Sequence, residues 1–204
     1  MSLKTINNII IISVLAALAG CSPSSNSFKD ISYPDDTQIA KALDAQLLSD
    51  PNSAAARALV HSMGGAEGKL KYKIQHVIYR QSAYEVHYDA ALVMGQSGAQ
   101  SLQSLYESMI PEEERKQLPE ATLPAYRDWL NAQANALEKQ AEKKVQGQVL
   151  RNTIAMLDKC YAEVTPGTEV VVLQGLGALL LPERSGLYAE KIQMPNTSAQ
   201  CLPL

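Results

Sequence analysis

The stretch Leu70-Lys-Tyr-Lys-Ile-Gln-His-Val-Ile-Tyr-Arg-Gln-Ser-Ala-Tyr-Glu-Val-His-Tyr-Asp-Ala-Ala-Leu-Val-Met94 decides the fold class. Two runs within it, residues 72–79 and 84–92, alternate apolar or aromatic side chains with polar ones. A period of two is typical of a β-strand with one buried face. We therefore expect a β-hairpin over residues 70–94.

The register of this hairpin depends on the length of its turn. A two-residue turn at 81–82 would place Ile78 opposite Glu85. A three-residue turn at 81–83 places Ile78 opposite Val86, so that apolar side chains share one face. Because a slip of one residue exchanges the two faces of a strand, we predict the three-residue turn.

A second hairpin is predicted over residues 168–193. Residues 168–174 (Thr-Glu-Val-Val-Val-Leu-Gln) are typical of a strand, residues 182–186 of a turn, and residues 187–193 of the returning strand. Gly175 and Gly177 indicate a bulge or a close approach of two backbones. The two hairpins can share one antiparallel sheet.

About four helices are expected around these hairpins. The first begins at Asp35 or Asp36, and the second has Asp50 as its N-cap and ends at Gly64-Gly65. A short third helix follows Ser97, its expected N-cap, and stops before Pro111.

The fourth predicted helix is the longest. Between residues 124 and 163 an apolar side chain recurs every three or four residues. Unbroken, this helix would be about 60 Å long, and Gly147 is the expected kink. A long helix without a tight heptad seam favours packing on its own domain over a coiled coil. Together these elements predict an α+β fold.

The amino-terminal residues indicate export. Lys4 precedes an apolar run, residues 9–19, which has the length of a signal peptide's core and is too short to span a membrane. The run ends in Leu18-Ala19-Gly20-Cys21. This sequence resembles the lipobox of bacterial lipoproteins. The resemblance implies that residues 1–20 are cleaved and that Cys21 carries diacylglycerol and an amide-linked acyl chain such as palmitate.

The predicted organisation follows from that resemblance. Residues 1–20 are the signal peptide, residues 21–34 the lipidated amino terminus and a polar tether, and residues 35–204 a single α+β domain. Residue 22 is Ser, whereas Asp at this position resembles an inner-membrane retention signal. The expected location is therefore the outer membrane, facing the periplasm, with the inner membrane and the cell surface as alternatives.

Two cysteines remain once Cys21 is lipidated. Cys160 and Cys201 are expected to form a disulfide in the oxidising envelope. Closing a loop of about 40 residues would stabilise the fold by about 4 kcal/mol. The alternative is a pair of unpaired buried thiols.

Charge and motifs exclude several classes of function. The net charge is −3, with no basic cluster that would indicate nucleic acid. No phosphate-binding loop or other cofactor motif is present. In the predicted register His76 and His87 lie on opposite faces, so no metal site is expected.

One motif resembles a catalytic serine. His61-Ser62-Met63-Gly64-Gly65 is similar to the nucleophile elbow of α/β-hydrolases, which would make Ser62 the nucleophile of an esterase. Val60 replaces the first glycine of that motif, and an Ala-rich helix precedes it where the elbow needs a strand. We therefore expect a helix end and no catalytic residue.

The expected function is that of a membrane-anchored lipoprotein without enzymatic activity. The leading hypothesis is a protein-interaction or accessory factor with an envelope protein as its partner. The alternative is a small-ligand binding module in which the hairpin tyrosines line a pocket; these are Tyr72, Tyr79, Tyr84 and Tyr88.

Overall fold

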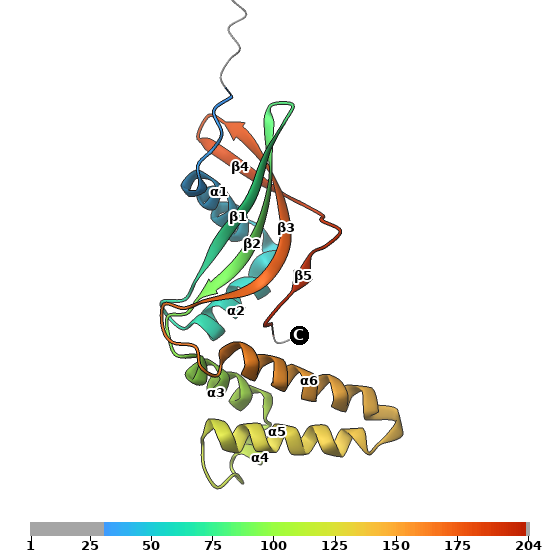
Figure 1. The fold of residues 1–204 in the computed structure, drawn as a ribbon. Coiled ribbons are helices and arrows are strands. Elements are labelled where there is room, and N and C mark those ends of the chain that lie inside the picture. Colours follow the sequence, from blue (N-terminus) through green and yellow to red (C-terminus); the bar gives the residue numbers. More distant parts are fainter. Residues whose placement is uncertain (1–30, 203–204) are drawn as a thin grey trace, which may run out of the picture. The chain divides into compact units, whose positions relative to one another are not determined.

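The computed structural model describes residues 31–202. By their internal contacts the residues divide into two units, Met1–Ser32 and Tyr33–Leu204. The second unit is the folded domain (Figure 1). Within the described residues it contains six α-helices and one antiparallel sheet of five strands, which confirms the predicted α+β class. The predicted signal peptide, the lipidated Cys21 and most of the tether lie outside the described residues.

The sheet consists of two hairpins side by side. β1 (Lys69–Arg80) pairs with β2 (Ala83–Val93), and β3 (Glu169–Glu183) pairs with β4 (Gly186–Ile192). Because β2 also pairs with β3, the strand order is β1-β2-β3-β4, and the short β5 (Ser198–Ala199) adds to β3. Both predicted hairpins and their union in one sheet are confirmed.

The predicted register of the first hairpin is wrong. The turn has two residues, Gln81 and Ser82, with φ of 45° and 77°, and Ile78 lies opposite Glu85. Two positive φ angles match the twist of a tight hairpin. A bulge at Gln75 then shifts the pairing by one residue and returns the apolar side chains of both strands to a common face.

A second bulge bends β3 where the sequence places Gly175 and Gly177. The pairing between β2 and β3 shifts at this point, and the amide of Gly175 donates to the Asp89 carboxylate at 2.9 Å. Gly175 has φ of +67°, and a Cβ there would lie 2.8 Å from the carbonyl oxygen of Asn196. The predicted bulge and close approach are both confirmed.

Two helices cover one face of the sheet (Figure 1). α1 (Asp36–Ser49) begins with a capping box between Asp35 and Gln38 and packs against β2, β3 and β4. α2 (Ala54–Gly64) follows the short helix η1 (Pro51–Ser53) and ends at Gly65, whose φ is +76°. The predicted beginning of α1 and end of α2 are confirmed.

Further helices gather at the end of the sheet where β2 ends and β3 begins (Figure 1). They are α3 (Gly98–Met109), α4 (Glu112–Arg115), α5 (Leu123–Glu138) and α6 (Lys144–Tyr161). Ser97 caps α3 as predicted, because its hydroxyl accepts from the amide of Gln100.

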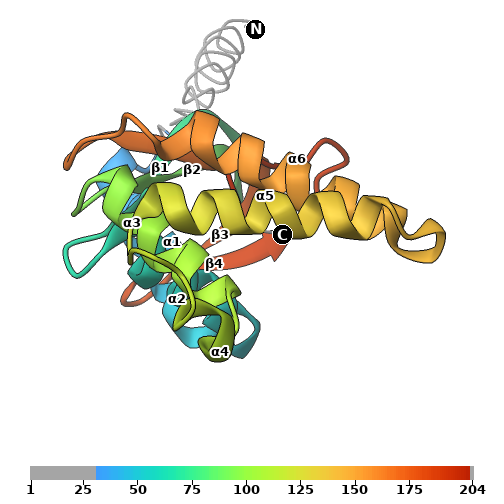
Figure 2. The ribbon, with the colours of Figure 1, turned by 90° about the horizontal axis from the view of Figure 1, so that it is seen from below.

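The prediction of one long helix over residues 124–163 is wrong. α5 ends at Glu138, the short helix η2 (Ala141–Lys143) follows, and α6 returns beside α5 (Figure 2). The chain leaves the helical conformation at Gln140, with φ of −94° and ψ of 118°. Folding back buries the apolar stripes of both halves, which a straight helix of this length would leave in water.

Gly147 serves this helical hairpin as a contact point between α5 and α6. It is buried in the second half of the hairpin, and a Cβ on it would lie 2.6 Å from the carbonyl oxygen of Ala134. Gly147 therefore lies within the continuous helix α6 and is not the predicted kink. It allows two helix backbones to pack closely.

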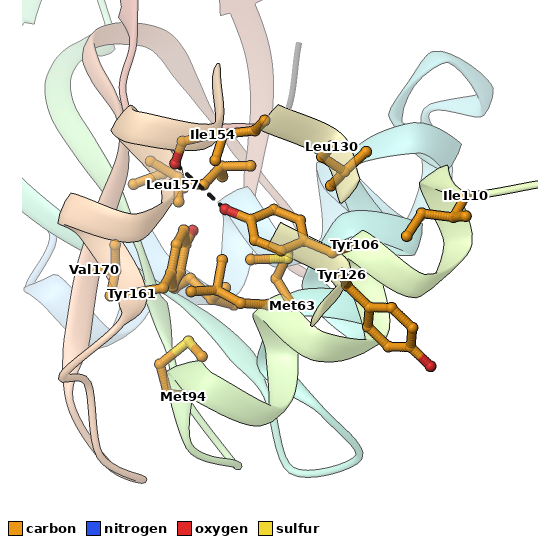
Figure 3. Packing of buried hydrophobic residues seen from close by; sticks show 14 residues of the cluster. Met63, Met94, Tyr106, Ile110, Tyr126, Leu130, Ile154, Leu157, Tyr161 and Val170 are labelled. Carbon is orange, nitrogen blue, oxygen red and sulfur yellow. Dashed lines mark hydrogen bonds between the residues drawn. The ribbon is translucent and has the colours of Figure 1, made fainter. Parts of the chain in front are cut away.

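The larger core cluster lies where α2, α3, α5 and α6 meet the sheet (Figure 3). Tyr106 is fully buried at its centre, and its hydroxyl donates to Asp158 at 3.0 Å. Arg127 binds the same carboxylate through two nitrogens, at 2.8 and 3.0 Å. The buried hydroxyl and the carboxylate therefore both have partners, as burial of polar groups requires.

No helix of residues 31–202 covers the opposite face of the sheet. Lys71 and Lys73 of β1 bind Glu169 of β3 on this face, at 2.6 and 3.2 Å. Towards β4 the face becomes apolar, with Leu179 half-buried and Tyr188 49% exposed. Among the described helices, none has the length and hydrophobicity needed to cross a membrane.

The close contact at Gly147 predicts a loss of stability when a methyl group is added. Gly147→Ala should lower the free energy of unfolding by about 1–3 kcal/mol, because the clash with Ala134 outweighs the gain of about 1 kcal/mol in helix propensity. Urea denaturation measures the change. Gln148→Ala, at the exposed neighbouring position, is the control and should stay within about 0.5 kcal/mol. A Gly147→Ala protein more stable than the parent would contradict the contact.

Candidate ligand-binding cleft

An apolar cleft of about 310 Å³ lies between α2 and the sheet. Its floor is formed by three buried side chains, Ala90 and Leu92 of β2 and Val172 of β3. Leu70 of β1 and Leu173 of β3 flank this floor and are half-buried. A volume of this size lies at the lower end of the range for ligand pockets.

The wall opposite the floor is one side of α2. It consists of Ala55, Ala56, Leu59 and Val60, with Ala55 exposed at the mouth. All residues that line the cleft are Ala, Val or Leu, so no side chain there offers a hydrogen bond. The cleft can bind by apolar contact and shape, and it contains no side chain capable of acid–base or nucleophilic chemistry.

Small side chains on both sides create the space. Ala55 and Ala56 of α2 line the cleft together with Ala90 of β2. The residues two positions before and after Ala90 on β2 are larger, namely Tyr88 and Leu92. A helix normally packs on a sheet by interlocking large side chains with small ones. The small alanine side chains of α2 leave space beside the sheet, and this space reaches solvent at Ala55.

Leu202 closes the cleft at the carboxyl end of the chain. Its neighbour Cys201 is joined by a disulfide to Cys160 in α6, with 5.7 Å between the two Cα atoms. The hydroxyl of Tyr161 donates to the carbonyl oxygen of Cys201 at 2.9 Å. The disulfide pair expected from the sequence is therefore present, and it holds one wall of the cleft.

Burial of Tyr161 strengthens this attachment. The side chain is fully buried in the larger core cluster, and burial raises the pKa of its hydroxyl to about 12. The hydroxyl thus stays protonated, and able to donate to Cys201, at every physiological pH.

The structure places Ser62 in the last turn of α2. Its exposed hydroxyl donates to the carbonyl oxygen of Leu59 at 3.2 Å, a bond within the helix. His61 precedes it on the exposed side of the helix, and Gly65 ends the element. The strand–turn–helix geometry of a nucleophile elbow is absent at these residues, in agreement with the predicted helix end.

The structure corrects the positions of the two hairpin histidines. His76 and His87 are direct cross-strand partners with ring centroids 6.2 Å apart, because the two-residue turn at Gln81 and Ser82 puts them on one face. His87 also contacts Glu85 at 2.7 Å, and hydrogen bonds from His87 and then Arg80 lower the pKa of Glu85. In residues 31–202 no three His, Cys, Asp or Glu side chains are placed to hold a metal ion.

The hairpin tyrosines do not line the cleft. Tyr72 donates to Asp44 of α1 at 2.9 Å, and its ring meets that of Tyr88 edge-on at 5.7 Å. Tyr79 and Tyr84 form a second ring contact near the turn, where Tyr33 joins them. The tyrosines thus fix the packing of α1 and of the chain entering it.

The residues of the cleft were not predicted as a site from the sequence. The only signal they carry is the run Ala54-Ala55-Ala56 followed by Leu59, which is equally typical of any helix. Comparisons with known proteins add no further information: no family model matches the chain, and no curated protein or solved structure is significantly similar to it.

The disulfide predicts a measurable contribution to stability. Replacing both Cys160 and Cys201 by Ala should lower the free energy of unfolding by about 4 kcal/mol, because the two residues close a long loop. Urea denaturation measures the loss. Dithiothreitol serves as the control: it should destabilise the parent to the same extent and leave the double variant unchanged. Equal midpoints for the oxidised parent and the variant would contradict this role.

Proposed function

We propose that the protein is a membrane-anchored envelope lipoprotein that acts by binding an apolar group in the cleft between α2 and the sheet. The observation that carries the proposal is the lining of the cleft, which is wholly apolar and reaches solvent at Ala55. Such a lining favours a binding or accessory role over catalysis.

The proposed anchor is Cys21 at the end of the lipobox-like sequence. Two or three acyl chains hold a protein stably at a bilayer, whereas one chain binds only marginally. The polar residues that follow Cys21 would act as a tether. The proposed location is the outer membrane on its periplasmic side, with Ser22 as the supporting residue.

Binding in this cleft would draw on the hydrophobic effect alone. Each methylene removed from water contributes about 0.8 kcal/mol. With no polar side chain in the lining, selection would rest on the width and length of the ligand. A polar group would be rejected because it would lose hydration without gaining a partner, and a branched group because it is wider than a linear chain.

A partner protein on the uncovered face of the sheet is a second candidate. Tyr188 is 49% exposed there, and Leu179 is half-buried on the same face. Exposed aromatic and aliphatic side chains are typical of interaction surfaces. This role is compatible with ligand binding, since the cleft lies on the other face.

Replacing Cys21 tests the anchor. In cells fed an alkyne-labelled palmitate, the parent protein should carry the label and lack residues 1–20. Cys21→Ser should lose the label and keep those residues, as measured by gel fluorescence and intact mass. Cys160→Ser is the matched control and should remain labelled, because only Cys21 belongs to the lipobox-like sequence. A labelled Cys21→Ser protein would contradict lipidation at this position.

The cleft is tested by placing a photocrosslinker at its mouth. p-Benzoylphenylalanine replaces Ala55, which lines the cleft, or Ala58, an exposed residue of the same helix that does not. Irradiation of cells should yield an adduct at position 55 and none at position 58. Equal adducts at both positions, or none at either, would contradict a binding role for the cleft.

A further inference from the structure

We propose that the cleft holds a single alkyl chain of a lipid that is not attached to this protein. This inference rests on the proposed function, because it names the ligand class of the same cleft. Three properties of the cleft support it: the chemistry of its lining, its size, and the position of its mouth.

The lining excludes a peptide segment as the occupant. A peptide brings an amide and a carbonyl group with every residue, and each must find a hydrogen-bond partner when buried. The side chains around the cleft are Ala, Val and Leu, and the backbone of the floor strands is engaged in pairing: Ala90 pairs with Tyr72 and Leu173, and Leu92 with Leu70 and Val170. An alkyl chain carries no polar group and avoids this cost.

The size of the cleft fits one chain and excludes a bulky ligand. A volume of 310 Å³ accommodates about ten groups of the size of a water molecule, at about 30 Å³ each. A linear chain of that number of methylenes can enter between α2 and the floor. Two chains side by side would exceed this volume. A fused ring system with a polar edge would place that edge against the apolar walls.

The mouth of the cleft allows the polar end of the lipid to remain in water. Ala55 is exposed, and Leu59 and Leu202 are half-buried, whereas the floor residues Ala90 and Leu92 are almost fully buried. The depth of burial therefore increases from mouth to floor. A lipid could insert its chain end first and leave its headgroup outside.

A photoreactive fatty acid tests this assignment. The mature lipoprotein is reconstituted in vesicles of phosphatidylethanolamine and phosphatidylglycerol that contain a fatty acid with a diazirine in its chain. After irradiation, mass spectrometry of the digested protein locates the label. We expect it on residues 54–64 of α2 or on the floor strands, and we expect excess unlabelled fatty acid to compete with it.

Ala56→Phe provides the decisive variant and Ala58→Phe its control. Phe at position 56 fills the cleft and should lower labelling by about tenfold, because exclusion of only two methylenes weakens binding by that factor. Phe at position 58, on the exposed side of the same helix, should leave labelling unchanged. Val60→Phe narrows the cleft from the same helix and should act like Ala56→Phe, which keeps the test valid if position 56 does not tolerate the larger residue.

Several outcomes would overturn the inference. Equal labelling of the two variants, or label confined to the uncovered face of the sheet, would exclude an alkyl chain in the cleft. Labelling restricted to a Cys21→Ser protein would indicate that the chain's own acyl groups fill the cleft. If the crosslinker at position 55 captures a protein while the fatty acid fails to label, the cleft remains a binding site but its ligand is not a lipid.

Discussion

The pairing of β2 with β3 is the constraint on which the rest of the domain depends. It joins Leu92 to Val170 across 77 intervening residues, and Tyr84 to Leu180 at the other end. Those intervening residues form α3 to α6, which therefore leave and return at the same end of the sheet (Figure 1). The larger core cluster fills the space that this closure creates, and the cleft lies beside it. Loss of the central pairing would separate floor, wall and core at once.

Much of this architecture could be predicted from local patterns. The alternation of apolar and polar residues with a period of two predicted both hairpins. The caps at Asp35, Ser97 and Gly65 predicted helix ends, because each satisfies backbone groups that a helix leaves unpaired. The errors arose where two local solutions were nearly equal. Gln81-Ser82 lacks the Asn-Gly signature of a tight turn, and the bulge at Gln75 compensates for a register that the simple alternation rejects.

The break between α5 and α6 could not be predicted from the sequence for a related reason. The apolar residues recur every three or four positions in α5 and again in α6. The same repeat would result from one continuous helix and from two helices that fold back on each other after Lys139. Gly147 signalled a special position, but only the packing against Ala134 reveals that it allows two backbones to approach. The cleft is harder still to predict, because it results from space left between Ala56 and Ala90, two residues distant in sequence.

The bond between Cys160 and Cys201 makes one wall of the cleft dependent on compartment. Thiols stay reduced in the cytosol and oxidise after export. Before that step, the segment carrying Leu202 is held by β5, the amide of Gln200 and the hydroxyl of Tyr161. In the exported lipoprotein proposed above, the cleft would therefore be less firmly closed before the disulfide forms than after it. The proposed binding site would then be completed only in the oxidising compartment.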